Sequence, residues 1–188
     1  MRKTLLEVHE LVAGYEKPVV GPLSFSLSEG EVVGLFGGNG CGKSTLFRAI
    51  AQTDARIFSG RLIKAPGLRV SWQTQQPVRL DEMPLNGWDY LRYAAAGTPP
   101  PPRLKTWLNR RVDALSGGEF QLLAVWAILA GEADLVLLDE PTNNMDPKGQ
   151  MALTEIIQAQ RGQRAILLIS HERDFLSQTC DRILEVGQ

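Results

Sequence analysis

The feature that most constrains the fold of this chain is a glycine-rich run between a strand-like and a helix-like segment. The run is Gly37-Gly38-Asn39-Gly40-Cys41-Gly42-Lys43-Ser44, followed by Thr45. It fits the phosphate-loop pattern G-x-x-x-x-G-K-[ST], which requires a strand before the loop and a helix after it. The apolar segment 32–36 predicts the strand, and the segment 45–50 predicts the helix. The combination indicates a loop that binds the phosphates of a nucleoside triphosphate.

The chemistry expected of this loop follows from its residue types. Glycines let successive backbone N–H groups point at phosphate oxygens, and the start of the following helix adds a partial positive charge. We expect Lys43 to reach the β- and γ-phosphates and Ser44 to offer its hydroxyl to Mg²⁺. A glycine-rich turn that matches the pattern by chance is the alternative, and the flanking strand and helix argue against it.

Strand-like and helix-like segments alternate along most of the chain, which predicts an α/β fold with a mostly parallel sheet. Strands are expected over residues 5–12, 22–31 (ending in a turn at 28–30), 32–36, 135–138, 164–170 and 182–186, with two short ones between 60 and 73. Helices are expected over 45–53, 86–96, 104–110, 120–130, 147–159 and 172–179. The prolines Pro99–Pro102 predict a stiff surface spacer. A length of 188 residues favours one domain.

Net charge, cysteine content and the length of apolar runs limit the partners and the compartment expected for this chain. The formal net charge is -1 and the pI is about 6.1, so no global positive field attracts nucleic acid, and we expect no nucleic-acid partner. Two cysteines, Cys41 and Cys180, make no disulfide framework and are typical of a reducing cytosol. No apolar run reaches the roughly 18 residues of a membrane span. If this chain functions at a membrane, we therefore expect a second chain to span the bilayer.

Two acids follow the continuous apolar run at 135–138. Asp139 and Glu140 come at the carboxyl end of this expected strand, where ligands of an open α/β sheet gather. An Asp there can hold the magnesium shell, and the adjacent Glu can polarise a water for attack on the γ-phosphate. Two solvated acids at a strand end are the alternative, and the phosphate loop upstream favours the functional interpretation.

A histidine and a serine-glycine segment mark two further candidate sites. His171 follows the apolar strand expected at 164–170, and it could hydrogen-bond the γ-phosphate or the attacking water. Its position alone leaves a purely structural role equally open. Ser116-Gly117-Gly118-Glu119 opens the apolar helix that continues from Phe120, and such a helix start can bind an anion. Local chemistry favours the simpler interpretation, an ordinary N-cap with Glu119 in the first turn.

In this order, the motifs resemble those of ATP-binding cassette (ABC) ATPases, and the resemblance extends from Tyr15 to Val186. Gly37–Thr45 is similar to the Walker A motif, Leu115–Gln121 to the signature motif, and Leu135–Glu140 to the Walker B motif with its catalytic Glu. The resemblance implies a P-loop NTPase core with a mostly parallel sheet, an N-terminal antiparallel β subdomain and a small, trimmed α-helical subdomain. It implies one domain over residues 1–188, with the helical subdomain inserted at about 77–131.

The resemblance also assigns roles that the residues alone leave open. It makes the segment 143–146 the D-loop and His171 the switch histidine. Gln75 is taken as the Q-loop glutamine, with Gln73 and Gln76 as competitors. Catalysis is thereby assigned to Glu140, His171, Gln75 and Lys43.

Nucleotide and metal contacts complete the expected site. Contacts with ATP are assigned to Tyr15, Gly37, Gly38, Asn39, Gly40, Cys41, Gly42, Lys43, Ser44, Thr45, Ser116, Gly117, Gly118 and Asp146. The Mg²⁺ ligands are assigned to Ser44, Gln75 and Asp139. Tyr15 would stack on adenine, and a core position at a strand end is its alternative role. Each ATP would lie between Walker A of one copy and Ser116-Gly117-Gly118 of a second copy in a head-to-tail homodimer.

The chain departs from the family in two places. The family usually has arginines where this chain has Phe120, Leu122 and Ala127, so the helix after the signature motif is more apolar. The stretch from 75 to 115 is shorter than in most relatives. We expect ATPase chemistry to survive, with polar contacts around that helix rewired.

Two functions follow from the resemblance. The first is the ATPase subunit of an ABC transporter, on the cytoplasmic face of a membrane and coupled to a separate permease. The segment Leu68–Leu91, with Met83-Pro84-Leu85 after the Q-loop, looks somewhat like importers of zinc or manganese. The second is a soluble translation-factor type of cassette, which the segments 139–143 and 170–176 resemble. That branch normally carries two cassettes and a charged linker in one chain, so transport is favoured.

Overall fold

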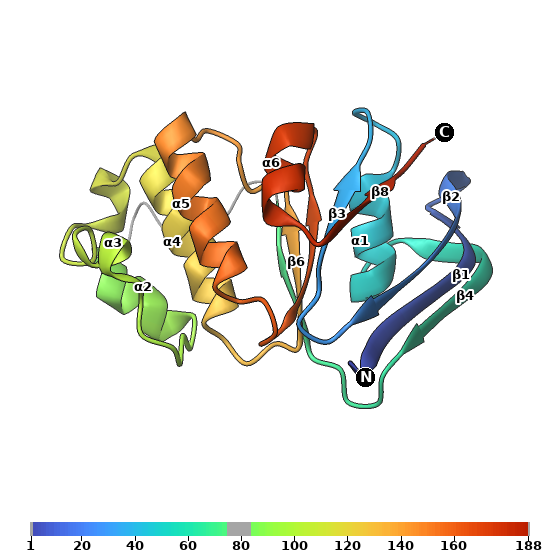
Figure 1. Ribbon diagram of the computed structural model, residues 1–188, viewed down its shortest axis with the longest axis horizontal. Helices are drawn as coiled ribbons and strands as arrows, with labels where there is room; N and C mark the ends of the chain where they lie inside the picture. Colours follow the sequence, from blue (N-terminus) through green and yellow to red (C-terminus); the bar gives the residue numbers. More distant parts are fainter. Residues whose placement is uncertain (1, 75–83, 188) are drawn as a thin grey trace.

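Two β-sheets enclose one helix in the computed structural model, which describes residues 2–74 and 84–187 (Figure 1). The first sheet is antiparallel, in the order β2-β1-β4, with β1 at Thr4–Gly14, β2 at Pro18–Ser28 and β4 at Arg56–Lys64. The second sheet is parallel, in the order β5-β6-β7-β3-β8. Its strands are β3 at Val32–Phe36, β5 at Val70–Gln73, β6 at Leu135–Asp139, β7 at Ala165–Ile169 and β8 at Arg182–Glu185. Helix α1 (Lys43–Ala51) lies between the two sheets. The predicted α/β class and the antiparallel N-terminal sheet are confirmed.

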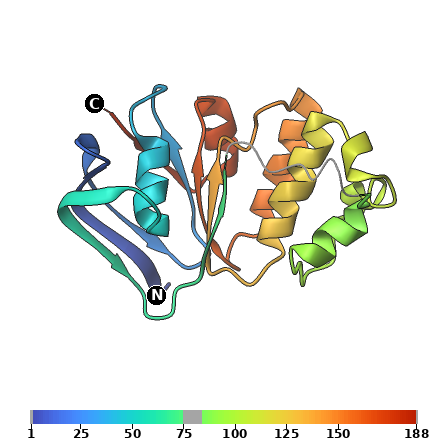
Figure 2. The same cartoon turned by 180° about the vertical axis from the view of Figure 1, so that it is seen from behind.

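The other helices cover the opposite face of the parallel sheet. They are α2 (Gly87–Tyr93), α3 (Pro102–Lys105), a 3₁₀ turn (Val112–Ala114), α4 (Gly117–Leu129), α5 (Pro147–Gln158) and α6 (Arg173–Thr179). From behind, α4 and α5 lie between the sheet and the α2–α3 region (Figure 2). Because strand side chains alternate between faces, Val136 and Leu138 pack toward these helices, while Leu135 and Leu137 pack toward α1. The parallel sheet is therefore apolar on both faces.

Several predicted elements differ from the observed ones. Strand β2 begins at Pro18, earlier than expected. The helix expected over 104–110 is only the single turn α3, after which i→i+3 bonds continue, from Trp107 N to Leu104 O and from Arg110 N to Trp107 O. These tighter turns end at Arg111, where the backbone bridges to Asn86. The prediction of a surface spacer at Pro99–Pro102 was wrong in part, because Pro100 is buried. Pro102 is the first residue of α3, a position that suits the fixed φ of proline.

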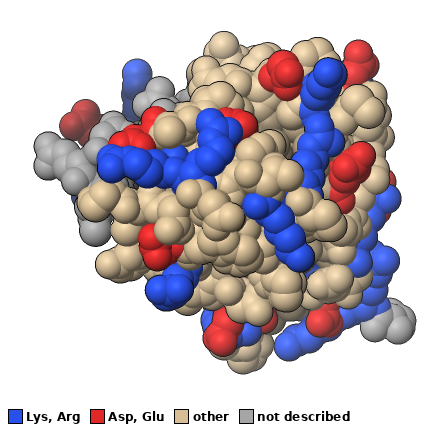
Figure 3. All heavy atoms as spheres, turned by 90° about the vertical axis from the view of Figure 1, so that its left-hand side faces the viewer, with Lys and Arg blue, Asp and Glu red and all other residues tan. Residues whose placement is uncertain are grey.

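Charged side chains are scattered over the helical end of the molecule, among a larger area of uncharged residues. Figure 3 shows Lys and Arg across this end with Asp and Glu between them. Exposed cations on these elements include Arg92, Arg103, Lys105, Arg110 and Lys148.

At the top of Figure 1, the carboxyl ends of the parallel strands β3, β6 and β7 meet, which brings together the loops that carry the predicted site residues.

Candidate functional site

The glycine-rich loop connects β3 to α1 and folds around the side chain of Lys43. The Lys43 ammonium donates hydrogen bonds to the carbonyl oxygens of Gly37 at 2.7 Å and Gly38 at 2.9 Å. Only 6% of Lys43 is exposed. A buried cation at the first residue of a helix places full and partial positive charge together, which is the electrostatic requirement for holding phosphate.

Gly42 shows why the loop needs glycine. Its backbone has φ 93°, in the left-handed region that L side chains rarely adopt. A Cβ at this position would lie 2.5 Å from Cβ of Val20 on β2. Both the backbone conformation and the close approach of β2 therefore exclude a side chain, and α1 can begin directly against the antiparallel sheet.

A hollow of about 340 Å³ opens beside this loop, and we call it the loop hollow. It is lined by Val19, Asn39, Gly40, Gly42, Lys43, Ser44, Thr45, Asp139, Glu140 and Ile169. Asp139 ends β6 and is 5% exposed. Burial raises the pKa of Asp139, its neighbour Glu140 raises it further, and the Ser44 hydroxyl hydrogen bond and the Lys43 charge oppose the shift. The predicted pairing of loop and strand-end acid is thus present in the geometry.

Glu140 and His171 meet at the edge of the loop hollow. The Nδ1 atom of His171 lies 2.9 Å from Oε2 of Glu140, although the two residues are 31 positions apart in the sequence. Glu140 is 8% exposed and has φ 48°, and its N–H donates to the carbonyl of Ile169 on β7. An uncommon backbone conformation therefore directs this carboxylate from β6 toward the histidine that follows β7.

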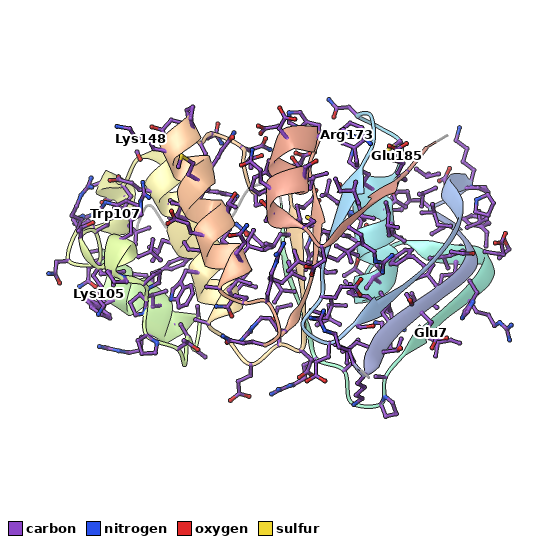
Figure 4. The ribbon with its side chains drawn as sticks, viewed as in Figure 1. Glu7, Lys105, Trp107, Lys148, Arg173 and Glu185 are labelled. Carbon is purple, nitrogen blue, oxygen red and sulfur yellow. The ribbon has the colours of Figure 1, made fainter. Side chains whose placement is uncertain are left out.

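A second hollow, of about 510 Å³, lies at the N-caps of α4 and α5, and we call it the cap hollow. It is lined by Arg103, Trp107, Ser116, Gly117, Gly118, Glu119, Leu122, Asn144, Asp146, Lys148 and Gly149. Figure 4 labels Trp107 and Lys148 on this side of the molecule. Among the described residues, none lines both the loop hollow and the cap hollow.

Hydrogen bonds fix both helix starts in the cap hollow. The Ser116 hydroxyl accepts from Glu119 N at 3.2 Å, and the Glu119 carboxylate accepts from Ser116 N at 2.8 Å. This capping box confirms the N-cap interpretation of Ser116. Burial alone would raise the pKa of Glu119, but the Ser116 backbone bond and the Arg110 guanidinium outweigh it and lower that pKa. Asp146 caps α5 with its side chain alone, by accepting from Gly149 N at 2.8 Å.

Two other predicted site residues have different outcomes. Tyr15 follows β1, is 38% exposed and is not among the residues that line the loop hollow; Val19 of β2 lines it instead. Gln75 and its competitor Gln76 lie outside the described residues. Gln73 is the last residue of β5, is 3% exposed, and has no hydrogen-bond partner for its amide among residues 2–74 and 84–187. The adenine and Q-loop assignments stay predictions.

Sequence reasoning missed several residues that line the two hollows. Val19 was missed because its strand was expected to begin four residues later. Arg103, Trp107 and Lys148 also line the cap hollow. Of these three, only Lys148 had a sequence signal, because a helix was predicted to begin directly after Asp146. The first two come from the region around α3, where the local pattern did not predict the observed turns.

The three departures after the signature motif are all buried, and Leu122 also lines the cap hollow. Phe120 is 3% exposed, Leu122 3% and Ala127 2%. The Phe120 ring packs edge-on against Tyr90 of α2, with ring centroids 5.6 Å apart and an interplanar angle of 70°. Helix α4 is therefore anchored to α2 by apolar packing at a position where the resemblance leads one to expect an arginine.

The chain is similar in sequence and in fold to known proteins. The sequence profile of the ABC transporter family matches residues 20–143. The zinc import ATP-binding protein ZnuC of Paracoccus denitrificans is 33% identical over 183 residues, which cover 91% of this chain and 70% of that protein. ZnuC of Alcanivorax borkumensis is 35% identical over 178 residues, which cover 88% of this chain and 68% of that protein. A solved ATP-binding subunit of an ABC transporter matches with a TM-score of 0.79 at 28% identity, covering 97% of this chain and 86% of that one.

Proposed function

This chain belongs to the ABC transporter family, and from that premise we propose that it binds ATP and hydrolyses it to power a separate membrane permease. One observation carries the proposal. Lys43, Asp139 and Glu140 converge on the loop hollow, and His171 is hydrogen-bonded to Glu140. A cation for phosphate, an acid for a metal and an acid for water are the parts that hydrolysis of a phosphoanhydride needs.

Each residue of the loop hollow has a distinct task in this proposal. Lys43 exchanges the carbonyls of Gly37 and Gly38 for phosphate oxygens when ATP binds, together with the N–H groups of the loop. Glu140 accepts a hydrogen bond from the attacking water and polarises it toward the γ-phosphate. His171 holds the Glu140 carboxylate in place and can donate to the γ-phosphate from its other ring nitrogen.

The donor set also fits Mg²⁺. The Ser44 hydroxyl and the Asp139 carboxylate both line the loop hollow, so both offer oxygen donors to a cation bound there. Oxygen donors of this kind suit a hard divalent ion, and a cation would offset the cost of burying the Asp139 charge. When bound, the metal supplies charge neutralisation to the phosphates. Gln75 is the third proposed ligand, and it lies outside the described residues.

We assign the cap hollow to the nucleotide of a second copy. Ser116, Gly117, Gly118 and Asp146 line it together, and it shares no lining residue with the loop hollow among the described residues. A head-to-tail homodimer would bring each cap hollow against the partner's loop hollow. In this proposal residues 1–188 form one ATP-binding domain, and the segment at about 77–131 is its helical subdomain.

The permease partner and its cargo follow from the relatives. No helix within residues 2–74 and 84–187 has the length and apolarity needed to cross a bilayer. Two similar proteins carry the name zinc import ATP-binding protein, which supports a metal ion as the transported substrate here. In this proposal the chain binds the cytoplasmic face of such an importer's permease.

Measurement of ATP turnover tests the proposal. Purified protein, alone and with its permease, should release phosphate from ATP only when Mg²⁺ is present. Lys43→Ala should abolish ATP binding, and Glu140→Gln should retain binding but lose turnover by at least about a hundredfold. Glu155→Gln, a change of the same type at an exposed acid on α5, should leave turnover unchanged. Absence of both binding and turnover would refute the ATPase assignment, and purification with ribosomes but no membrane partner would refute transport.

A further inference from the structure

A side-chain hydrogen bond joins α5 to the segment that carries His171. The Gln150 side-chain amide donates to both carboxylate oxygens of Glu172, at 3.2 Å and 3.0 Å. Both residues are half-buried. A bond from an amide to an ionised acceptor in such a position is stronger than one between neutral, exposed groups. It therefore constrains where the residue next to Glu172 lies.

At one end, this bond begins in the turn that lines the cap hollow. Asp146, Lys148 and Gly149 all line that hollow, and Gln150 is the next residue along α5. The Gln150 N–H donates to the carbonyl of Asp146 at 3.0 Å, so the capped first turn fixes the Gln150 backbone. A ligand that shifts this turn would move the backbone that carries the Gln150 side chain.

At the other end, the bond holds a short segment that has several more anchors. Glu172 N donates to the Ser170 hydroxyl at 3.1 Å. Arg173 donates to Glu185 of β8 at 2.9 Å, and its guanidinium lies 5.2 Å from the centre of the Phe36 ring (Figure 4). Phe36 is the last residue of β3, directly before the glycine-rich loop. His171 is thus held between fixed neighbours while its ring contacts Glu140.

We propose that Gln150 is a positioning residue that sets His171 against Glu140 and makes that pair sensitive to what occupies the cap hollow. The inference rests on the proposed ATPase function. The path runs from Asp146 through the first turn of α5 to Gln150, then to Glu172, His171 and Glu140. It joins two hollows that share no lining residue among the described ones. Binding at the cap hollow would then promote hydrolysis at the loop hollow of the same copy.

The chain offers a matched control. Gln158, two turns further along α5, also uses its side-chain amide to join α5 to α6, by donating to the carbonyl of Gln178 at 2.7 Å. Gln158 touches neither hollow. Gln150→Ala and Gln158→Ala therefore each remove a side-chain amide that donates hydrogen bonds from α5, the first to the N-cap of α6 and the second to α6 itself. Only Gln150 lies on the proposed path.

The test compares turnover in the full chain. Gln150→Ala should lower kcat by about tenfold with little change in KM for ATP, and the Hill coefficient for ATP should fall toward one. Gln158→Ala should leave all three unchanged. Gln150→Glu should be at least as impaired, because two carboxylates would face one another, and adding Glu172→Gln should restore kcat by reversing donor and acceptor.

A second readout does not depend on turnover. The chain has two histidines, so in a His9→Ala background the imidazole NMR signals report on His171 alone. Gln150→Ala should shift these signals and Gln158→Ala should not. Equal effects of the two variants on kcat and on the signals would overturn the inference, as would no effect of Gln150→Ala on either. If wild-type protein binds no ATP, the proposed function fails, while the NMR comparison still tests the link from Gln150 to His171.

Discussion

Cys41 is the residue of the glycine-rich loop whose chemistry is easiest to test. Its sulfur lies 3.9 Å from the Lys43 ammonium, close to the start of α1, and the residue is half-buried. We predict that a maleimide reacts at Cys41 and blocks ATP binding, and that saturating MgATP protects the thiol. The measurement is the labelling rate at Cys41, followed by mass spectrometry with and without ATP.

Cys180 provides the internal control for this experiment. It is buried, and that burial raises the pKa of its thiol to about 12. We therefore expect Cys180 to stay unlabelled in the folded protein. Equal labelling of Cys41 with and without ATP would contradict the prediction.

The site residues of the glycine-rich loop and of the strand end after β6 could be predicted from the sequence. Contacts that depend on long-range packing could not. Lys43, Ser44 and Asp139 were expected together because a phosphate loop and the carboxyl end of a parallel strand share one edge of the sheet. The contact between His171 and Glu140 depends on the neighbouring positions of β6 and β7, which no local pattern encodes. The bond from Gln150 to Glu172 carries no sequence signature at all.

Helix α4 begins with a capping box whose strength should depend on pH. The pKa of Glu119 is lowered in the folded protein, so its carboxylate stabilises the fold above the unfolded pKa, and this contribution is lost as pH falls through the folded pKa. Glu119→Ala should therefore cost about 1 kcal/mol at pH 7. Chemical unfolding of both proteins should show that the difference disappears below about pH 4. A constant difference from pH 7 to pH 3 would contradict the assignment.

The apolar face of α4 gives a second prediction at this scale. Phe120→Arg would bury a guanidinium against Tyr90 and should lower the free energy of unfolding by at least about 3 kcal/mol. Thermal unfolding measures the loss. Tyr93→Arg is the control, because Tyr93 of α2 is 72% exposed and should tolerate the change. Similar melting temperatures for wild type and Phe120→Arg would show that this position accepts the arginine usual in the family.

Elements with continuous apolar sequence were predicted well, and those shaped by their connections were not. The apolar strands β6 and β7 and the buried helix α4 were found within a few residues, because complete burial requires continuous apolar sequence. The bounds predicted for helix α3 were wrong, because the chain after Lys105 forms tighter turns that lead to the backbone bridge between Asn86 and Arg111. That bridge belongs to the tertiary fold.

At the scale of the whole molecule, the separated hollows predict dimerisation that depends on nucleotide. Glu140→Gln should bind MgATP without turning it over and should therefore accumulate as a dimer. Size-exclusion chromatography with light scattering measures this directly. Glu140→Gln without nucleotide is the control and should elute as a monomer. A monomer at saturating MgATP would count against the head-to-tail assembly.

The absence of any shared lining residue between the loop hollow and the cap hollow, within residues 2–74 and 84–187, has a kinetic consequence. If each reaction centre takes one wall from each of two molecules, the rate of a dilute solution rises with the square of protein concentration. An inactive copy would then also occupy and silence active ones. A small excess of a defective gene product would suppress transport in a cell that still makes the intact chain.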